Sequence, residues 1–295
     1  NTRLTLYKTD AANSTMTISA TGYGGSKAVI SGTGLSVSPN NTLTTNTTQN
    51  YTVTSTANSG TGTLTIYNSD NTKTVALPIT MADGEIRING AANNNASISL
   101  YPKGGQTSTV KVKSATGISS WSVSNWGSGG RSGWFSLPGT PAAGEPTVTL
   151  TAVNQVATQK ASIVTLKNKI SGCPDRTFTV TPNFKAPELS VSSSLSLNAG
   201  QDYNVPSVTI SGTCPGGASI SGENWITYSS TNTDDATYSF TLSLVPDKDN
   251  FPTSVSGNKT FTIINKQNTN LKTTVTVNIT ESNPWIAKDL SSYDN

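Results

Sequence analysis

Apolar and polar side chains alternate along most of this 295-residue chain, and β-branched residues occur on both faces of the alternation. A period of two predicts strands, because successive side chains of a strand point to opposite faces of its sheet. The predicted strands are residues 3–8, 15–20, 35–38, 50–55, 63–67, 74–80, 96–101, 109–113, 121–124, 134–137, 147–152, 161–166, 176–181, 195–197, 206–210, 224–229, 238–245, 259–264 and 271–279. A helical period never extends beyond a few residues, so the pattern predicts an all-β protein.

Short stretches rich in Gly, Asn, Asp and Ser separate the predicted strands, for example residues 58–62 and 265–270. Such stretches indicate turns. About seven short strands in roughly 95 residues, with a turn every 8–12 residues, are typical of an immunoglobulin-like sandwich. The strand pattern therefore predicts immunoglobulin-like sandwich domains.

One short motif occurs three times at nearly constant spacing. Residues 19–22 and 114–117 both read Ser-Ala-Thr-Gly, and residues 211–214 read Ser-Gly-Thr-Cys. A long fixed period indicates an array of similar modules.

We therefore predict three tandem immunoglobulin-like β-sandwich domains in an elongated array. Their predicted bounds are residues 1–82, 83–184 and 185–281, followed by a tail or linker at 282–295 that contains Trp285. Pro187 should stiffen the second connection, because it fixes its own φ and restricts Ala186.

The composition narrows the class of partner and compartment. Charged residues make up 12% of the chain, against roughly 25% in an average soluble protein. Ser, Thr, Asn and Gly replace them, as is common in extracellular and virion β proteins. The net charge is +3 without a basic cluster, and no apolar stretch approaches the length of a membrane span. We expect no nucleic-acid partner and no direct membrane insertion.

Several features argue against catalysis and metal binding. The chain has no histidine, and none of its five glutamates belongs to a recognisable paired-carboxylate motif. We therefore predict a protein that is not an enzyme and has no cofactor and no metal site. Residues 247–250 (Asp-Lys-Asp-Asn) leave two interpretations open, a calcium loop or a solvated turn. Cys173 and Cys214 fall in different predicted domains, and we expect two free thiols.

The tryptophans of the middle domain are the candidate binding residues. Trp121 shares a strand face with Val123 and should fill the core of the sandwich. Trp134 and Phe135 are adjacent in a predicted strand, so one of them should point outward or into a neighbour. Sugars stack on aromatic rings while polar groups bond their hydroxyls. Trp126, Arg131 and Trp134 are therefore carbohydrate-binding candidates; the other interpretation is packing of the loop over the end of the sandwich.

The middle domain resembles the BACON family, which consists of immunoglobulin-like modules of Bacteroidota proteins and their phages. The resemblance rests on residues 121–124 (Trp-Ser-Val-Ser), 134–137 (Trp-Phe-Ser-Leu), a Gly/Pro turn, and 148–154 (Val-Thr-Leu-Thr-Ala-Val-Asn). It covers about a third of the chain, and the Gly-rich residues 127–133 depart from it. The resemblance implies a spacer or a carbohydrate-binding module.

The sequence thus predicts a non-catalytic structural or adhesive protein. It would be a stalk on a bacterial cell surface, or a decoration or fibre component of a phage virion. The alternative is an array of modules that bind mucin or another polysaccharide. The expected partner is a glycan or a neighbouring structural protein, and the expected location is extracellular, on the cell surface or in a virion.

Overall fold

A computed structural model describes residues 3–124, 133–153, 160–190, 194–199, 207–224, 226–231, 236–244 and 256–281. The regular elements in these residues are strands, which confirms the predicted all-β class. The strands form pairs of stacked sheets that follow one another along the chain, as expected for tandem immunoglobulin-like sandwiches. We refer to β1–β7, β8–β15 and β16–β23 as modules 1, 2 and 3.

Module 1 packs a four-stranded sheet, in the order β1-β7-β6-β3, on a three-stranded sheet, β2-β5-β4. Its strands are β1 (Leu4–Lys8), β2 (Ser14–Thr21), β3 (Ser26–Ser31), β4 (Leu35–Ser38), β5 (Thr48–Ser55), β6 (Gly60–Asn68) and β7 (Thr74–Asp83). β1 runs parallel to β7, and the other neighbours in both sheets are antiparallel.

Module 2 packs two four-stranded sheets, β12-β13-β10-β8 and β11-β14-β15-β9. Its strands are β8 (Arg87–Ile88), β9 (Ala96–Leu100), β10 (Thr107–Lys113), β11 (Ile118–Ser124), β12 (Phe135–Ser136), β13 (Thr147–Ala152), β14 (Ser162–Asn168) and β15 (Arg176–Pro182). β9 runs parallel to β15, in the same way as β1 does to β7.

Module 3 repeats this plan with the sheets β16-β18-β21-β20 and β17-β23-β22-β19. Its strands are β16 (Glu188–Leu189), β17 (Ser194–Ala199), β18 (Ser207–Thr213), β19 (Ala218–Ser221), β20 (Ile226–Thr231), β21 (Thr237–Leu244), β22 (Gly257–Asn265) and β23 (Lys272–Glu281). β17 runs parallel to β23.

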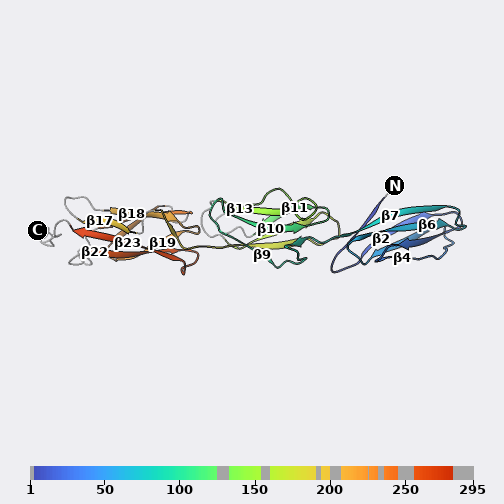
Figure 1. Cartoon of the computed structure of the whole chain (residues 1–295), viewed down its shortest axis with the longest axis horizontal. Helices are drawn as coiled ribbons and strands as arrows, with labels where there is room; N and C mark the ends of the chain where they lie inside the picture. The colour runs from blue at the N-terminus through green and yellow to red at the C-terminus, as the bar shows by residue number, and fades with distance from the viewer. Residues whose placement is uncertain are drawn as a thin grey trace, which may run out of the picture.

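Each module encloses its own apolar core, built from the inward side chains of its two sheets. Residues of different modules do not share a core cluster in the part of the chain that is described. Tyr51, Phe178 and Phe261 are among the largest fully buried side chains of modules 1, 2 and 3. The modules lie end to end along the long axis of the molecule, which gives an elongated rod (Figure 1).

Four strands have no counterpart among the predicted ones: β3, β8, β16 and β19. β8 and β16 are two residues long, too short to show alternation in the sequence. They are first strands that lead from one module into the next, so tertiary pairing rather than local pattern defines them.

The repeated motif does not mark equivalent positions in all three modules. Gly22, Ser114 and Cys214 each follow the second long strand of their module and donate their N–H to a carbonyl just before the facing strand begins; the acceptors are Thr47, Gly144 and Ala236. Gly22 and Cys214 therefore correspond, as the motif predicts. The equivalent residue of module 2 is Ser114, the first residue of the motif there and not its last.

Candidate functional site

Trp134 is a core residue and not an exposed sugar platform. Its side chain is 2% exposed, and its indole N–H donates to Ser162 Oγ at 3.1 Å and to the Lys160 carbonyl at 3.2 Å. Phe135 is also 2% exposed, and the two rings meet edge to face with centroids 4.9 Å apart. The expectation that one of them points outward or into a neighbour is wrong, because both side chains belong to the core cluster of module 2. Trp134 precedes β12, so strand alternation does not apply to it.

Trp121 packs against the core of module 2 on the same side of β11 as Val123, as predicted, but both side chains stay partly exposed. Trp126 and Arg131, the other two carbohydrate-binding candidates, lie outside the described residues, and so do the acidic residues 247–250. Burial therefore removes Trp134 from the predicted sugar site, and Trp126 and Arg131 stay a prediction. Within the described ranges, no group of three or more Cys, Asp or Glu side chains is placed to hold a metal ion.

The best-defined polar clusters lie at the two joints between modules, and an asparagine anchors each of them. Asn68, Asn168 and Asn265 end the equivalent strands β6, β14 and β22. Each pairs with the first residue of the neighbouring strand; the pairs are Ser26–Asn68, Ile118–Asn168 and Ala218–Asn265. This shared register makes the three asparagines structural counterparts.

Two of these asparagines bind the chain that arrives from the preceding module. The Asn168 side-chain amide donates to the Gly84 carbonyl at 2.9 Å, and that of Asn265 donates to the Lys185 carbonyl at 3.3 Å. In module 1, the Asn68 amide donates to Thr72 within its own turn. The same side chain thus fixes the incoming linker at both joints.

Gly84 is held from both sides at the first joint. Its N–H donates to the Lys8 carbonyl of module 1 at 2.7 Å, while its carbonyl accepts from Asn168 of module 2. A Cβ at this position would lie 2.7 Å from Cys173 Sγ and 3.2 Å from Tyr7 Cβ. Position 84 requires glycine, because the Cβ of any other residue would collide with these two side chains.

The linker also carries a buried carboxylate. The Glu85 side chain has no exposed surface; it forms an ion pair with Arg176 of module 2 and accepts the Asp10 N–H of module 1 at 2.9 Å. Buried charges are tolerated only when they are paired and hydrogen-bonded. Glu85 therefore fixes both modules around one charge.

A second guanidinium completes the first joint. Arg87 of module 2 binds Asp10 and Asp83 of module 1, each with a shortest N–O distance of 2.8 Å. Its hydrogen bonds raise the pKa of Arg87, and the hydrogen bond from Arg87 lowers the pKa of Asp10. Mutual stabilisation of the charged forms ties the ends of the two modules together.

The second joint is built around Glu188, whose side chain is 47% exposed. Its carboxylate binds Lys103 Nζ of module 2 at 2.6 Å and accepts from Thr213 Oγ1 of module 3 at 3.0 Å. The hydrogen bond from Lys103 is the main cause of a lowered Glu188 pKa, and that from Thr213 adds to it. Because solvent screens exposed pairs, this contact is weaker than the one at Glu85.

An aromatic contact supplements that pair. Lys185 Nζ lies 4.5 Å from the centre of the Tyr101 ring, which is a cation–π geometry. Burial is the main cause that raises the pKa of Tyr101 to about 12. Pro187 is buried, and its carbonyl accepts from Thr273 Oγ1 at 2.6 Å, so it belongs to the packed start of module 3.

Both cysteines lie at these joints as free thiols. Cys173, in the β14–β15 turn, contacts Gly84, and burial raises its pKa. Cys214, directly after β18, is buried and donates to the Gly217 carbonyl; burial raises its pKa to about 11. High pKa values keep both as poorly reactive thiols at neutral pH.

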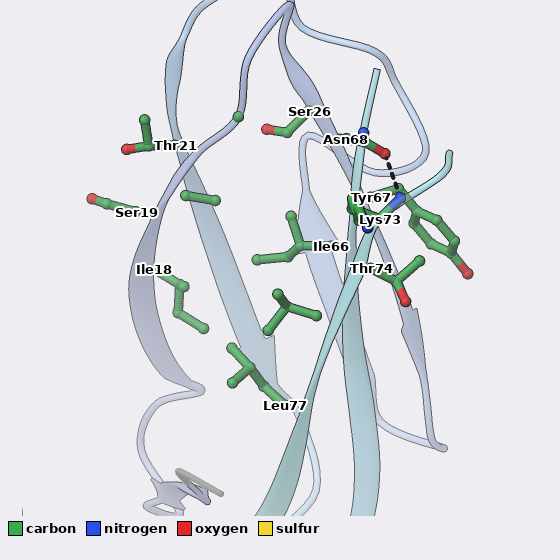
Figure 2. A pocket seen from close by; sticks show the side chains of 13 residues that line it. Ile18, Ser19, Thr21, Ser26, Ile66, Tyr67, Asn68, Lys73, Thr74 and Leu77 are labelled. Carbon is green, nitrogen blue, oxygen red and sulfur yellow. Dashed lines mark hydrogen bonds between the residues drawn. The ribbon is translucent and has the colours of Figure 1, made fainter. Parts of the chain in front are cut away.

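In module 1, the region equivalent to these joints lies at the end away from module 2. It forms an open groove of about 320 Å³ between β2 and the β6–β7 hairpin. Figure 2 shows Ile18, Ile66 and Leu77 in the space between these elements, whereas Ser19 and Thr21 point away from it. A hydrogen bond from the Lys73 N–H to Asn68 Oδ1, 2.9 Å long, closes the hairpin beside the groove.

No protein-family model and no curated protein matches this chain. The solved structures that match this chain include a complex of Dpr2 Ig1–Ig2 with DIP-Theta Ig1–Ig3, at 9% identity and a TM-score of 0.35, covering 95% of this chain and 97% of that one. A structure of three immunoglobulin domains of titin has 11% identity, a TM-score of 0.33 and 95% coverage of both chains.

An endo-fucoidan hydrolase of glycoside hydrolase family 107 has 15% identity and a TM-score of 0.26. The match covers 96% of this chain but only 43% of the hydrolase. At these identities and TM-scores, the functions of these proteins do not transfer to this chain. The resemblance of the middle module to the BACON family stays a prediction.

In the described ranges of the chain, no helix has the length and apolar character that crossing a membrane requires.

Proposed function

We propose that this protein is a non-catalytic spacer, a stiff rod that holds whatever is attached at its two ends a fixed distance apart. Its surface, which is rich in hydroxyl and amide groups, suits an extracellular position, on a bacterial cell surface or in a virion. The finer assignment of module 2 to the BACON family belongs to the same proposal. The expected partners are a neighbouring structural protein or a glycan.

The observation that supports this role best is the double attachment of Gly84. Free hinging between modules needs a linker that is bound on one side only or not at all. Here one residue donates its N–H to Lys8 of module 1 and accepts at its carbonyl from Asn168 of module 2, and Glu85 bridges the same two modules beside it. Bending at this joint would break these bonds together.

Small-angle X-ray scattering of the dilute chain tests the rod. The expected result at low salt is a narrow distance distribution with one maximum dimension. The double variant Glu85→Gln, Asn168→Ala should broaden the distribution, because it removes the ion pair of Glu85 with Arg176 and the amide that binds the Gly84 carbonyl. Lys167→Ala is the matched control, since Lys167 pairs with Asp175 inside module 2 and does not touch the linker.

A wild-type distribution as broad as that of the double variant would contradict the spacer role. So would a double variant that bends no more than Lys167→Ala, because the joint contacts would then not set the stiffness.

A further inference from the structure

The second joint spreads over two residues the backbone attachments that Gly84 combines at the first joint. The N–H of Asn183 donates to the Leu100 carbonyl of module 2 at 2.9 Å. The carbonyl that accepts from Asn265 of module 3 belongs to Lys185, two residues later. The chain between the two attachments therefore contains the φ and ψ of three residues, against those of one residue at Gly84. The second linker can bend further before either bond breaks.

A proline explains why module 2 releases the chain earlier than module 1 does. The parallel β1–β7 ladder extends to Lys8 opposite Asp83, whereas the β9–β15 ladder ends at Leu100 opposite Pro182. Aligning the two modules on their equivalent asparagines places Pro102 at the position of Lys8. Proline has no N–H to donate to a ladder, so it suits the end of a strand and not its continuation.

The linker belongs to module 3 from Phe184 onward. The Phe184 ring lies against Gly216, because a Cβ added to Gly216 would be 2.9 Å from Phe184 Cε1. Three residues further on, the Pro187 carbonyl accepts from Thr273 Oγ1 of module 3. Asn183 is bonded to module 2, so the pivot between the two modules lies between Asn183 and Phe184.

The contacts that close the second joint are exposed. Lys103 of module 2 and Glu188 of module 3 pair at 2.6 Å, with side chains that are 34% and 47% exposed. Lys185 adds its cation–π contact with Tyr101. The first joint is closed around Glu85, whose side chain has no exposed surface. Dissolved ions screen exposed charges far more than buried ones, so salt should loosen the second joint and spare the first.

We propose that the second joint is the hinge of the rod, with its pivot between Asn183 and Phe184, and that the Lys103–Glu188 pair closes it until salt screens that pair. Hinges of this kind absorb a domain movement in the φ and ψ of a few linker residues. The rod is then extended in dilute salt and bends between modules 2 and 3 at high ionic strength. This inference rests on the spacer role, because a hinge sets an end-to-end distance only in a chain that is otherwise stiff.

Distances between spin labels measure each joint separately in the full chain. Thr17, Thr109 and Thr209 are exposed and occupy the same position in β2, β10 and β18. Labels on Thr17→Cys with Thr109→Cys span the first joint, and labels on Thr109→Cys with Thr209→Cys span the second. Both proteins also carry Cys173→Ala and Cys214→Ala, which remove one Sγ from each joint alike. Double electron–electron resonance measures the two distance distributions.

The expected result is a narrow distribution across both joints at about 10 mM salt, where the Debye length is about 30 Å. At about 1 M salt, where it is about 3 Å, the distribution across the second joint should broaden and the other should not. Lys103→Gln should raise the bent population at low salt about two- to fivefold, the factor that one exposed ion pair supports, and remove most of its salt dependence. Lys167→Gln is the matched control, since Lys167 pairs with Asp175 inside module 2.

A distribution across the second joint that stays narrow at high salt and in Lys103→Gln would overturn the proposal. Equal broadening across both joints would do the same, and so would a Lys167→Gln protein that bends as much as Lys103→Gln. Circular dichroism of each labelled protein verifies that it is folded. A broad distribution across the first joint at low salt would contradict the spacer role itself, so the two failures are told apart.

Discussion

The joint between modules 1 and 2 and the joint between modules 2 and 3 begin with the same contact and differ in where they place charge. An asparagine amide binds a linker carbonyl at both. Beside it, the first joint buries Glu85 completely against Arg176, whereas the second joint leaves Glu188 about half exposed against Lys103.

This difference separates geometry from strength. The hydrogen bond from an asparagine amide, which both joints share, positions the linker. The surrounding charge decides how much free energy is needed to break the joint. An unpaired buried charge is strongly unfavourable, whereas an exposed pair exchanges its partner for water with little change in free energy. We expect a first joint that is rigid and insensitive to salt, and a second joint that salt and acid loosen.

Removal of the buried charge should have the largest effect. Glu85→Ala leaves Arg176 without its carboxylate and the Asp10 N–H without an acceptor, so we expect a loss of about 3–5 kcal/mol in the free energy of unfolding of module 2. Denaturant unfolding followed by circular dichroism measures it.

Glu188→Ala is the control for that experiment and should cost only about 0.2–1 kcal/mol. Equal losses from the two substitutions would show that the joints do not differ in the way their burial indicates.

The three equivalent asparagines give the next comparison. Asn265 is fully buried and both ends of its side chain are bonded, so Asn265→Ala should cost about 2–3 kcal/mol. Asn168 is only partly buried, and Asn168→Ala should cost about 1–2 kcal/mol. Asn68→Ala, where no linker is bound, should cost least. Thermal melts of the three variants measure the order of these losses in stability. A different order would show that linker binding and burial of the asparagine do not contribute to stability in parallel.

Rates of thiol labelling report how readily each joint opens on its own. Cys173 contacts Gly84 and is half-buried, while Cys214 is buried at the second joint, so a thiol reagent at pH 8 should react with Cys173 first. Asn168→Ala should raise the Cys173 rate about tenfold, corresponding to about 1.4 kcal/mol of easier opening, and leave the Cys214 rate unchanged. Peptide mass mapping reads both sites. Acceleration of both thiols alike would indicate global unfolding instead of a local joint.

The smallest expected effect is the change with pH of the stability that the Glu188–Lys103 pair gives the second joint. Lys103 lowers the pKa of Glu188 in the folded chain, so the stability from this pair is fully present above the ordinary Glu pKa of about 4.3 and is lost as pH falls through the lowered value. The difference in unfolding free energy between wild type and Glu188→Gln, at most about 1 kcal/mol at pH 7, should shrink towards zero near pH 3. A difference that is constant over this range would exclude the ion pair as its source.

Several strands follow directly from the sequence. The period of two places most of the strands, including β13 and β4 with the bounds that the structure has, because alternating burial is a local property of each strand. The sequence also places Trp121 and Val123 on one face. It fails at Trp134, because its burial depends on contacts with Lys160 and Ser162, more than twenty residues away.

What the sequence by itself determined is the all-β class and the rhythm of strands within each module, since both depend on neighbours along the chain. The tertiary structure alone decided the joints. Gly84, Glu85 and Asn168 carry no pattern of their own, and they become a site only when two modules meet.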